Sequence, residues 1–270
     1  MRNLRRSTST TMACQDEGTG TPIVLLHGYC GSHRYFEEIL PILSAKYRVI
    51  VPDLRGHGSS SATEGVYKME QLADDLDVLL DAMQLSKVFL FGHSLGGYVT
   101  LAFAQRHRER LLGYGLLHST SLPDTGPGKT GRLKAVDQIR TGGISPFVDE
   151  LIPKLFAKDH RETMKGKINF AKEIGYGTAP QGAIGCALGM RERSDRTNVL
   201  EMPDLPVLLL AGEKDDIITP DRRFPILKPK PHLTQVTLKG VGHMGMLEAP
   251  QEFADALISF IAANEGSGGA

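Results

Sequence analysis

The stretch Phe91-Gly-His-Ser-Leu-Gly-Gly-Tyr98, FGHSLGGY, places a serine between glycines directly after the apolar run Lys87-Val-Phe-Leu-Phe91. Ser94 stands at the centre of a G-x-S-x-G pattern, and a helix-like segment, 98–106, follows it. A sharp strand-to-helix turn strains the serine backbone, and glycines two residues to either side let strand and helix approach closely. The pattern therefore predicts an exposed, nucleophilic Ser94. The alternative is a glycine-rich turn that binds phosphate or only packs.

Other apolar runs of strand length occur on both sides of this turn. They are Ile23–Leu26, Tyr47–Val51, Val88–Phe91, Leu111–Leu117, Val207–Ala211 and Leu233–Leu238. Their apolarity is continuous rather than alternating, which indicates strands that are covered on both faces, as in a mainly parallel sheet. The segments 69–81 and 251–262 carry apolar residues at helical spacing. The sequence therefore predicts an α/β fold.

The alternation of strand-like and helix-like segments stops between Leu117 and Pro206, where the sequence shows no convincing strand. Helix-like pieces occur instead at 132–140, 146–156, 163–174 and 181–192, separated by Gly and Pro clusters. A structureless loop of that length would be unusual inside a compact domain. We therefore expect a core domain built from 1–117 and 206–264, an inserted helical subdomain at 118–205, and a flexible tail at 265–270.

A serine hydroxyl becomes a good nucleophile only when a neighbouring base takes its proton, and that base needs an acid to orient it. The strand Val207–Ala211 runs into an acidic turn, Gly212-Glu-Lys-Asp-Asp216, in which Asp215 is the preferred acid. Asp216 remains an alternative, and Glu213 is less favoured. His243 lies in a glycine-flanked loop between the last predicted strand and the last predicted helix, so it is the predicted base.

Such a site also needs hydrogen-bond donors for a developing oxyanion. The predicted donors are two backbone N–H groups, that of Tyr29 in the turn after the first strand and that of Leu95 directly after Ser94. Cys30 borders this turn, but no base is available to it, and we interpret it as a packed thiol. The ionisable loop 52–60 is interpreted as a salt-bridged support for the turn rather than as a catalytic cluster.

The composition narrows the class of partner. Lys plus Arg and Asp plus Glu number 31 each, so the formal net charge is zero and gives no basic field for nucleic acid or an anionic membrane. The three cysteines are odd in number and lack C-x-x-C spacing, which argues against a disulfide framework or a zinc site. No signal peptide or membrane span is predicted. We expect a cytoplasmic protein with a small-molecule partner, no cofactor and no metal.

With these pieces in place, the chain resembles the α/β-hydrolase superfamily over essentially its whole length. The matching segments are HGYCGS at 27–32, VPDLRGHGSS at 51–60, FGHSLGG at 91–97, LLLAGEKDDIITP at 208–220 and VGHMGMLEAP at 241–250. The resemblance implies an eight-stranded type of sheet flanked by helices, with 118–205 as a helical cap. It implies the same roles for Ser94, Asp215, His243, Tyr29 and Leu95 as the residues themselves suggest.

Within the superfamily, the sequence is most similar to small bacterial carboxylesterases, enol-lactonases and cofactor-free perhydrolases. The resemblance implies a serine carboxylesterase that cleaves small, largely apolar esters through an acyl-enzyme on Ser94. A perhydrolase, a lactonase and a C–C bond hydrolase with the same triad are alternatives, as is a ligand sensor on a hydrolase scaffold. Haloalkane dehalogenases and epoxide hydrolases of this fold are disfavoured, because they carry aspartate where Ser94 stands.

Overall fold

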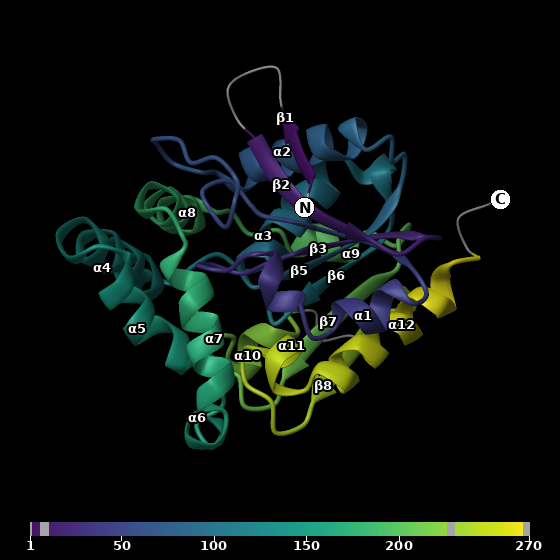
Figure 1. Cartoon of the computed structure of the whole chain (residues 1–270). Coiled ribbons are helices and arrows are strands. Elements are labelled where there is room, and N and C mark those ends of the chain that lie inside the picture. Colours follow the sequence, from purple (N-terminus) through teal and green to yellow (C-terminus); the bar gives the residue numbers. More distant parts are fainter. Residues whose placement is uncertain (1, 6–10, 226–229, 267–270) are drawn as a thin grey trace.

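The computed structural model describes residues 2–5, 11–225 and 230–266, and a single mixed sheet runs through its centre (Figure 1). The strands are β1 (Arg2–Arg5), β2 (Thr11–Glu17), β3 (Pro22–Leu26), β4 (Arg48–Pro52), β5 (Val88–His93), β6 (Leu111–Leu117), β7 (Val207–Gly212) and β8 (Leu233–Leu238). Their order across the eight-stranded sheet is β1-β2-β4-β3-β5-β6-β7-β8. The pairs β1–β2 and β2–β4 are antiparallel, and the other pairs are parallel. The predicted mainly parallel sheet is confirmed.

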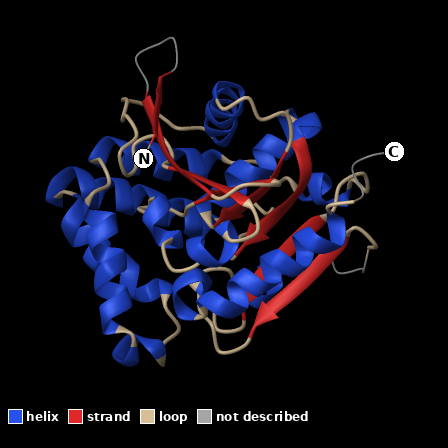
Figure 2. Cartoon of the chain, turned by 45° about the vertical axis from the view of Figure 1, so that its right-hand side comes forward, coloured by secondary structure: helices blue, strands red, loops and turns tan. Residues whose placement is uncertain are grey.

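Burial explains why the central strands read as continuous apolar runs. Every residue of β5 and of β7 is buried. Side chains alternate between the two faces of a strand, so full burial requires cover on both sides of the sheet. That cover comes from α1 (Leu40–Ser44) and α12 (Pro250–Asn264), which contact each other, and from α2 (Met69–Ala82) and α3 (Leu95–Arg106), which also pack together. Figure 2 shows helices on both faces of the strands.

In the described parts of the chain outside the insertion, α2, α3 and α12 are the long helices, and the other helical elements are short. The set comprises α1 (Leu40–Ser44), α2 (Met69–Ala82), α3 (Leu95–Arg106), α10 (Pro220–Arg223), α11 (Gly245–Glu248) and α12 (Pro250–Asn264), with 3₁₀ turns at His33–Phe36 and Arg108–Arg110. In α2 the predicted apolar stripe, which begins at Met69 and ends at Leu80, is buried. In the part of the chain that the structure describes, no helix is both long and apolar enough to cross a bilayer.

Between β6 and β7 the chain forms helices only. They are α4 (Gly126–Gly142), α5 (Ile144–Leu155), α6 (His160–Thr163), α7 (Lys165–Tyr176), α8 (Pro180–Glu192) and α9 (Thr197–Glu201). Helix α4 packs on α8, and α5 packs on α7. Figure 1 shows α4 to α8 gathered on the left, to one side of the sheet. The insertion therefore starts at the carboxyl end of β6 and returns to the first residue of β7 at the opposite edge of the sheet, because the two strands are parallel. Of the predicted tail, 267–270 lies outside the described residues.

Candidate active site

Ser94 lies on the turn between β5 and α3, and its backbone is strained. It has φ 50° and ψ −112°, a conformation that residues with a side chain rarely adopt. The turn is held by the backbone, because Ser94 N–H donates to Leu117 O at 3.0 Å and Gly97 N–H donates to Ser94 O at 2.9 Å. This turn therefore places the half-buried Ser94 side chain at the end of β5.

Two glycines make this turn possible. A Cβ atom at Gly92 would lie 2.1 Å from the backbone oxygen of Gly96, and one at Gly96 would lie 2.5 Å from the backbone oxygen of Leu26. Neither neighbour is the movable end of a side chain. Strand β5, helix α3 and strand β3 thus meet backbone to backbone, as the spacing of glycines around Ser94 predicts.

Asp215 and His243 come together from the ends of β7 and β8. His243 Nδ1 lies 2.8 Å from Asp215 Oδ2, and both residues are 2% exposed. The other carboxylate oxygen, Oδ1, accepts hydrogen bonds from the backbone N–H groups of Ile217 and Ile218 at 2.8 and 2.9 Å. The Asp215 carboxylate is therefore fixed at both oxygens, with one of them directed at the histidine.

The other two acidic residues of the turn point elsewhere. Asp216 has a side chain that is 53% exposed, and it forms an ion pair with Lys158 at 3.3 Å. Glu213 accepts a hydrogen bond from Gly240 N–H at 2.8 Å. Of the three candidates for the acid, the structure brings only Asp215 to His243 within the described residues.

The charge of Asp215 follows from its surroundings. Burial by itself would raise the pKa of this carboxyl group, but attraction to His243 and to the neighbouring His118 outweighs burial and lowers the pKa well below its usual range. Asp215 is therefore a carboxylate near neutral pH and can only accept hydrogen bonds. It follows that His243 carries its proton on Nδ1 and presents an unprotonated Nε2 when the ring is neutral.

His118 is a site residue that sequence reasoning missed. It follows β6 directly, is fully buried, and has a positive φ of 47°. Its Nδ1 lies 3.6 Å from Asp215 Oδ2, slightly beyond hydrogen-bond length. With Asp215 and His243 it forms a set whose possible ligand atoms all lie within 4.8 Å of one another, and two histidines with a carboxylate suit zinc. An ion bound by His243 Nδ1 and Asp215 Oδ2 would displace the proton between these two atoms.

His93, the residue before Ser94, connects the serine turn to the histidine loop. Burial lowers the pKa of His93 well below its usual value, so the ring is neutral. His93 Nε2 lies 2.9 Å from the backbone oxygen of His243, which makes Nε2–H the donor. The centroids of the His93 and His243 rings are 5.0 Å apart. His93 Nδ1 faces Gly28, where a Cβ atom would lie only 2.6 Å away. The turn that carries Ser94, the loop that carries His243 and the turn after β3 thus all contact the His93 side chain.

The two predicted oxyanion donors have free N–H groups. Among the residues that the structure describes, the backbone N–H groups of Tyr29 and Leu95 donate no hydrogen bond. Leu95 begins α3, where the first amides of a helix have no partner within the helix. Free N–H groups at a helix start attract negative charge. Both groups therefore have the hydrogen-bonding capacity that an oxyanion requires.

The loop after β4 supports the turn that carries Tyr29. Cys30 N–H donates to His57 Nε2 at 3.3 Å, and His33 N–H donates to Asp53 Oδ1 at 2.7 Å. Burial lowers the pKa of His57 to about 3, so its ring stays neutral and can accept this bond. The interpretation of this loop as a support agrees with these contacts. Burial also raises the pKa of the Cys30 thiol far above neutral, which removes its reactive thiolate form.

Comparisons with known proteins bear on the family of the chain and on its fold. Residues 21–127 match the model of the alpha/beta hydrolase fold family. The chain is 31% identical to a thermophilic esterase from Thermogutta terrifontis, with a TM-score of 0.91 over 97% of this chain and 99% of that one. It is 28% identical to the pimeloyl-[acyl-carrier protein] methyl ester esterase of Aeromonas hydrophila over 90% of this chain and 96% of that protein.

A third relative is longer than this chain. It is the dihydrolipoyllysine-residue acetyltransferase component of the acetoin cleaving system of Pseudomonas putida, which is 30% identical over 90% of this chain. The chain spans 64% of that relative's length. These likenesses show that the chain belongs to the α/β-hydrolase fold family, as its motifs predict. The expectation of an ester hydrolase agrees with the esterases among its relatives.

Proposed function

We propose that this protein is a serine carboxylesterase in which Ser94 is the nucleophile, His243 the base and Asp215 the acid. The observation that carries the proposal is the buried 2.8 Å contact between His243 Nδ1 and the Asp215 carboxylate. That contact leaves His243 Nε2 free to accept a proton. We propose that this proton comes from the Ser94 hydroxyl, which becomes nucleophilic when it is lost.

The reaction has two steps. His243 removes the hydroxyl proton as Ser94 attacks the ester carbonyl, and Asp215 stabilises the imidazolium that forms. The backbone N–H groups of Tyr29 and Leu95 bind the oxyanion, and the proton then passes from His243 to the leaving alcohol. Water, deprotonated by the same histidine, next attacks the acyl group on Ser94 and releases the acid. One oxyanion donor is worth on the order of 10²–10³ in kcat.

The substrates that we propose are small, largely apolar esters, and we propose that 118–205 forms the cap that selects among them. The esterases among the relatives support esters as the substrate class, and the small, apolar character of these esters is our own proposal. Two of the similar proteins are named as enol-lactonases. A lactone is therefore the first substrate that we would test beside open-chain esters. The cytoplasmic location stays a prediction from the sequence.

The test is hydrolysis of short-chain p-nitrophenyl esters by the wild-type protein and by Ser94→Ala. We expect kcat to fall by on the order of 10⁶ in the variant, because the acyl-enzyme route is lost. Labelling with a fluorophosphonate should modify the wild type at Ser94 and leave the variant unmodified. Equal rates and equal labelling in the two proteins would refute the proposal.

A further inference from the structure

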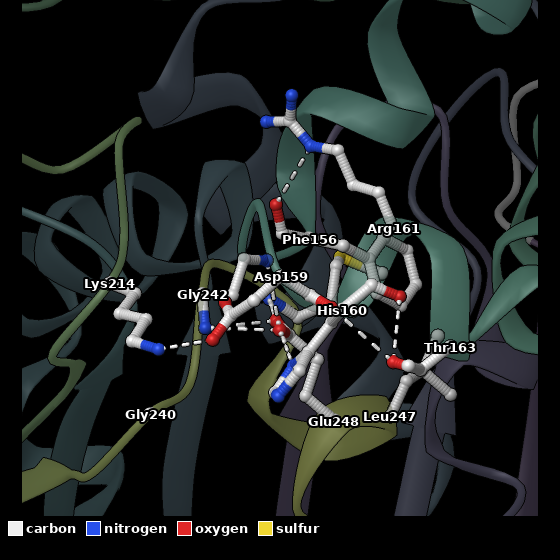
Figure 3. Close-up of polar contacts among 12 residues, drawn as sticks. Phe156, Asp159, His160, Arg161, Thr163, Lys214, Gly240, Gly242, Leu247 and Glu248 are labelled. Carbon is white, nitrogen blue, oxygen red and sulfur yellow. Dashed lines mark hydrogen bonds and ion pairs between the residues drawn. The ribbon is translucent and has the colours of Figure 1, made fainter.

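Glu248, at the end of α11, is a buried carboxylate that the reaction above does not use. Its side chain is 0% exposed, and a charge can be kept in such a place only if it is well hydrogen bonded. Four donors surround it: Ala157 N–H at 3.0 Å, His160 Nδ1 at 2.7 Å, Gly242 N–H at 3.1 Å from each carboxylate oxygen, and Met244 N–H at 3.0 Å. Figure 3 shows Glu248 with two of these donors, His160 and Gly242.

Two of these donors flank the proposed base. Gly242 and Met244 are the residues immediately before and after His243, and both direct their N–H groups at the same carboxylate. The N–H group of His243 itself donates to Leu155 O at 2.8 Å, and its carbonyl oxygen accepts the bond from His93. The backbone is therefore held at three consecutive residues, which fixes the direction in which the imidazole leaves the chain.

The other two donors come from the insertion between β6 and β7. Ala157 and His160 belong to the segment 155–160, which runs from the end of α5 into α6. The same segment contacts the acid turn at the surface, because Asp159 pairs with Lys214 and Lys158 pairs with Asp216. Those surface pairs are solvated and contribute little. The buried Glu248 contacts are the strong connection between the segment 155–160 and the histidine loop.

We propose that Glu248 is the positioning residue of the base, and that with His160 it makes the orientation of His243 depend on the inserted helices. The inference rests on the proposed function of His243. A base must lie within hydrogen-bond reach of the hydroxyl proton, and a displacement of about 1 Å can cost on the order of 10²-fold in rate. Glu248 touches neither substrate nor reacting atoms, so it acts only through the position of His243.

The central variant is Glu248→Gln, which keeps the size of the side chain but replaces one acceptor oxygen with an NH₂ group that faces the existing N–H donors. We expect kcat for p-nitrophenyl acetate to fall by on the order of 10²-fold, with KM changed less than about threefold. His160→Ala should cause a smaller loss. His160→Asn should recover most of that loss, because the asparagine NH₂ group can replace the Nδ1 donor.

Two matched variants separate positioning from general stability. Tyr114→Phe removes another buried hydrogen bond, which Tyr114 Oη donates to Val199 O at 2.9 Å. Tyr114 pairs with Val207, the first residue of β7, and so lies away from the strand ends that carry the candidate site. It should lower Tm and leave kcat unchanged at 25 °C. Asp159→Asn removes an exposed ion pair of the segment 155–160 and should also leave kcat unchanged. Wild-type kcat in Glu248→Gln, or a fall in kcat in Tyr114→Phe at the same loss of Tm, would overturn the inference.

A spectroscopic measurement separates this inference from the proposed function. The proton between His243 Nδ1 and Asp215 should give a low-field ¹H NMR resonance, which Asp215→Asn identifies by its loss. In Glu248→Gln and His160→Ala this resonance should move or broaden, and in Asp159→Asn it should not. If the wild type proves inactive on esters, a shifted resonance still supports positioning by Glu248. An unchanged resonance in both variants refutes it. If Glu248→Gln does not fold, the His160 pair of variants carries both measurements.

Discussion

Two adjacent aspartates at the end of β7 show how far one residue position determines chemistry. Asp215 is buried against His243, whereas the Asp216 side chain is about half exposed and forms an ion pair with Lys158. We expect Asp215→Asn to lower kcat by about 10⁴-fold, because an amide no longer holds the histidine in the tautomer with a free Nε2. Asp216→Asn should keep kcat within about twofold, since surface ion pairs contribute little. Ester hydrolysis by the purified variants measures both, and equal losses would contradict the assignment.

At the same scale, the position of Asp215 in the site is predictable from the sequence, and that of His118 is not. Asp215 is predictable because parallel strands end at one edge of the sheet, which brings the turn after β7 near the loop after β8. Adjacency alone left Asp216 open, because which of two neighbouring side chains faces inward depends on the local turn. His118 carries no motif at all. It lies 3.6 Å from Asp215 only because β6 lies between β5 and β7.

At the scale of elements, the junction of β5 and α3 is the most constrained part of the fold. We expect Gly92→Ala to abolish activity and to lower Tm or prevent folding, because its Cβ atom would lie 2.1 Å from Gly96 O. The matched control is Gly131→Ala in α4, where nothing lies within 4 Å of the added atom. It should stabilise the protein by roughly 0.5–1 kcal/mol. Thermal unfolding and esterase assays on both variants test this, and a fully active Gly92→Ala would refute it.

The elements that the sequence predicts are those with a long, uniform burial pattern. Strands β5 and β7 and helices α2 and α12 fall in this class. Strand β2, which the apolar runs did not predict, is TMACQDE with only two buried positions, and it pairs antiparallel with β4 near one side of the sheet. Helices of four or five residues, such as α1 and α10, are too short to show a helical period. Tertiary contacts, not local pattern, determine these elements.

At the scale of the whole molecule, the fold buries several neutral histidines. Burial lowers the pKa of His27, His57 and His93, in the case of His57 to about 3. An unfolded chain binds protons on such side chains below about pH 6.5, whereas the folded protein does not. The free energy of unfolding should therefore fall as the pH falls below that value. The carboxyl groups with lowered pKa, Asp53 and Asp215, should add their loss only below about pH 4.

The size of this effect can be tested on His57 alone. Between pH 8 and pH 5 its lowered pKa should remove about 2 kcal/mol from the free energy of unfolding, since each pH unit below 6.5 costs about 1.4 kcal/mol until the folded-state pKa is reached. Urea unfolding at pH 8, 6.5 and 5 measures this loss. His57→Gln should flatten the pH dependence by that amount, because the glutamine oxygen can still accept the Cys30 N–H bond and takes up no proton in this range. The same slope in wild type and variant would show that the loop after β4 does not need a neutral imidazole at His57, and the support of the Tyr29 turn would then have to come from the Asp53 contacts alone.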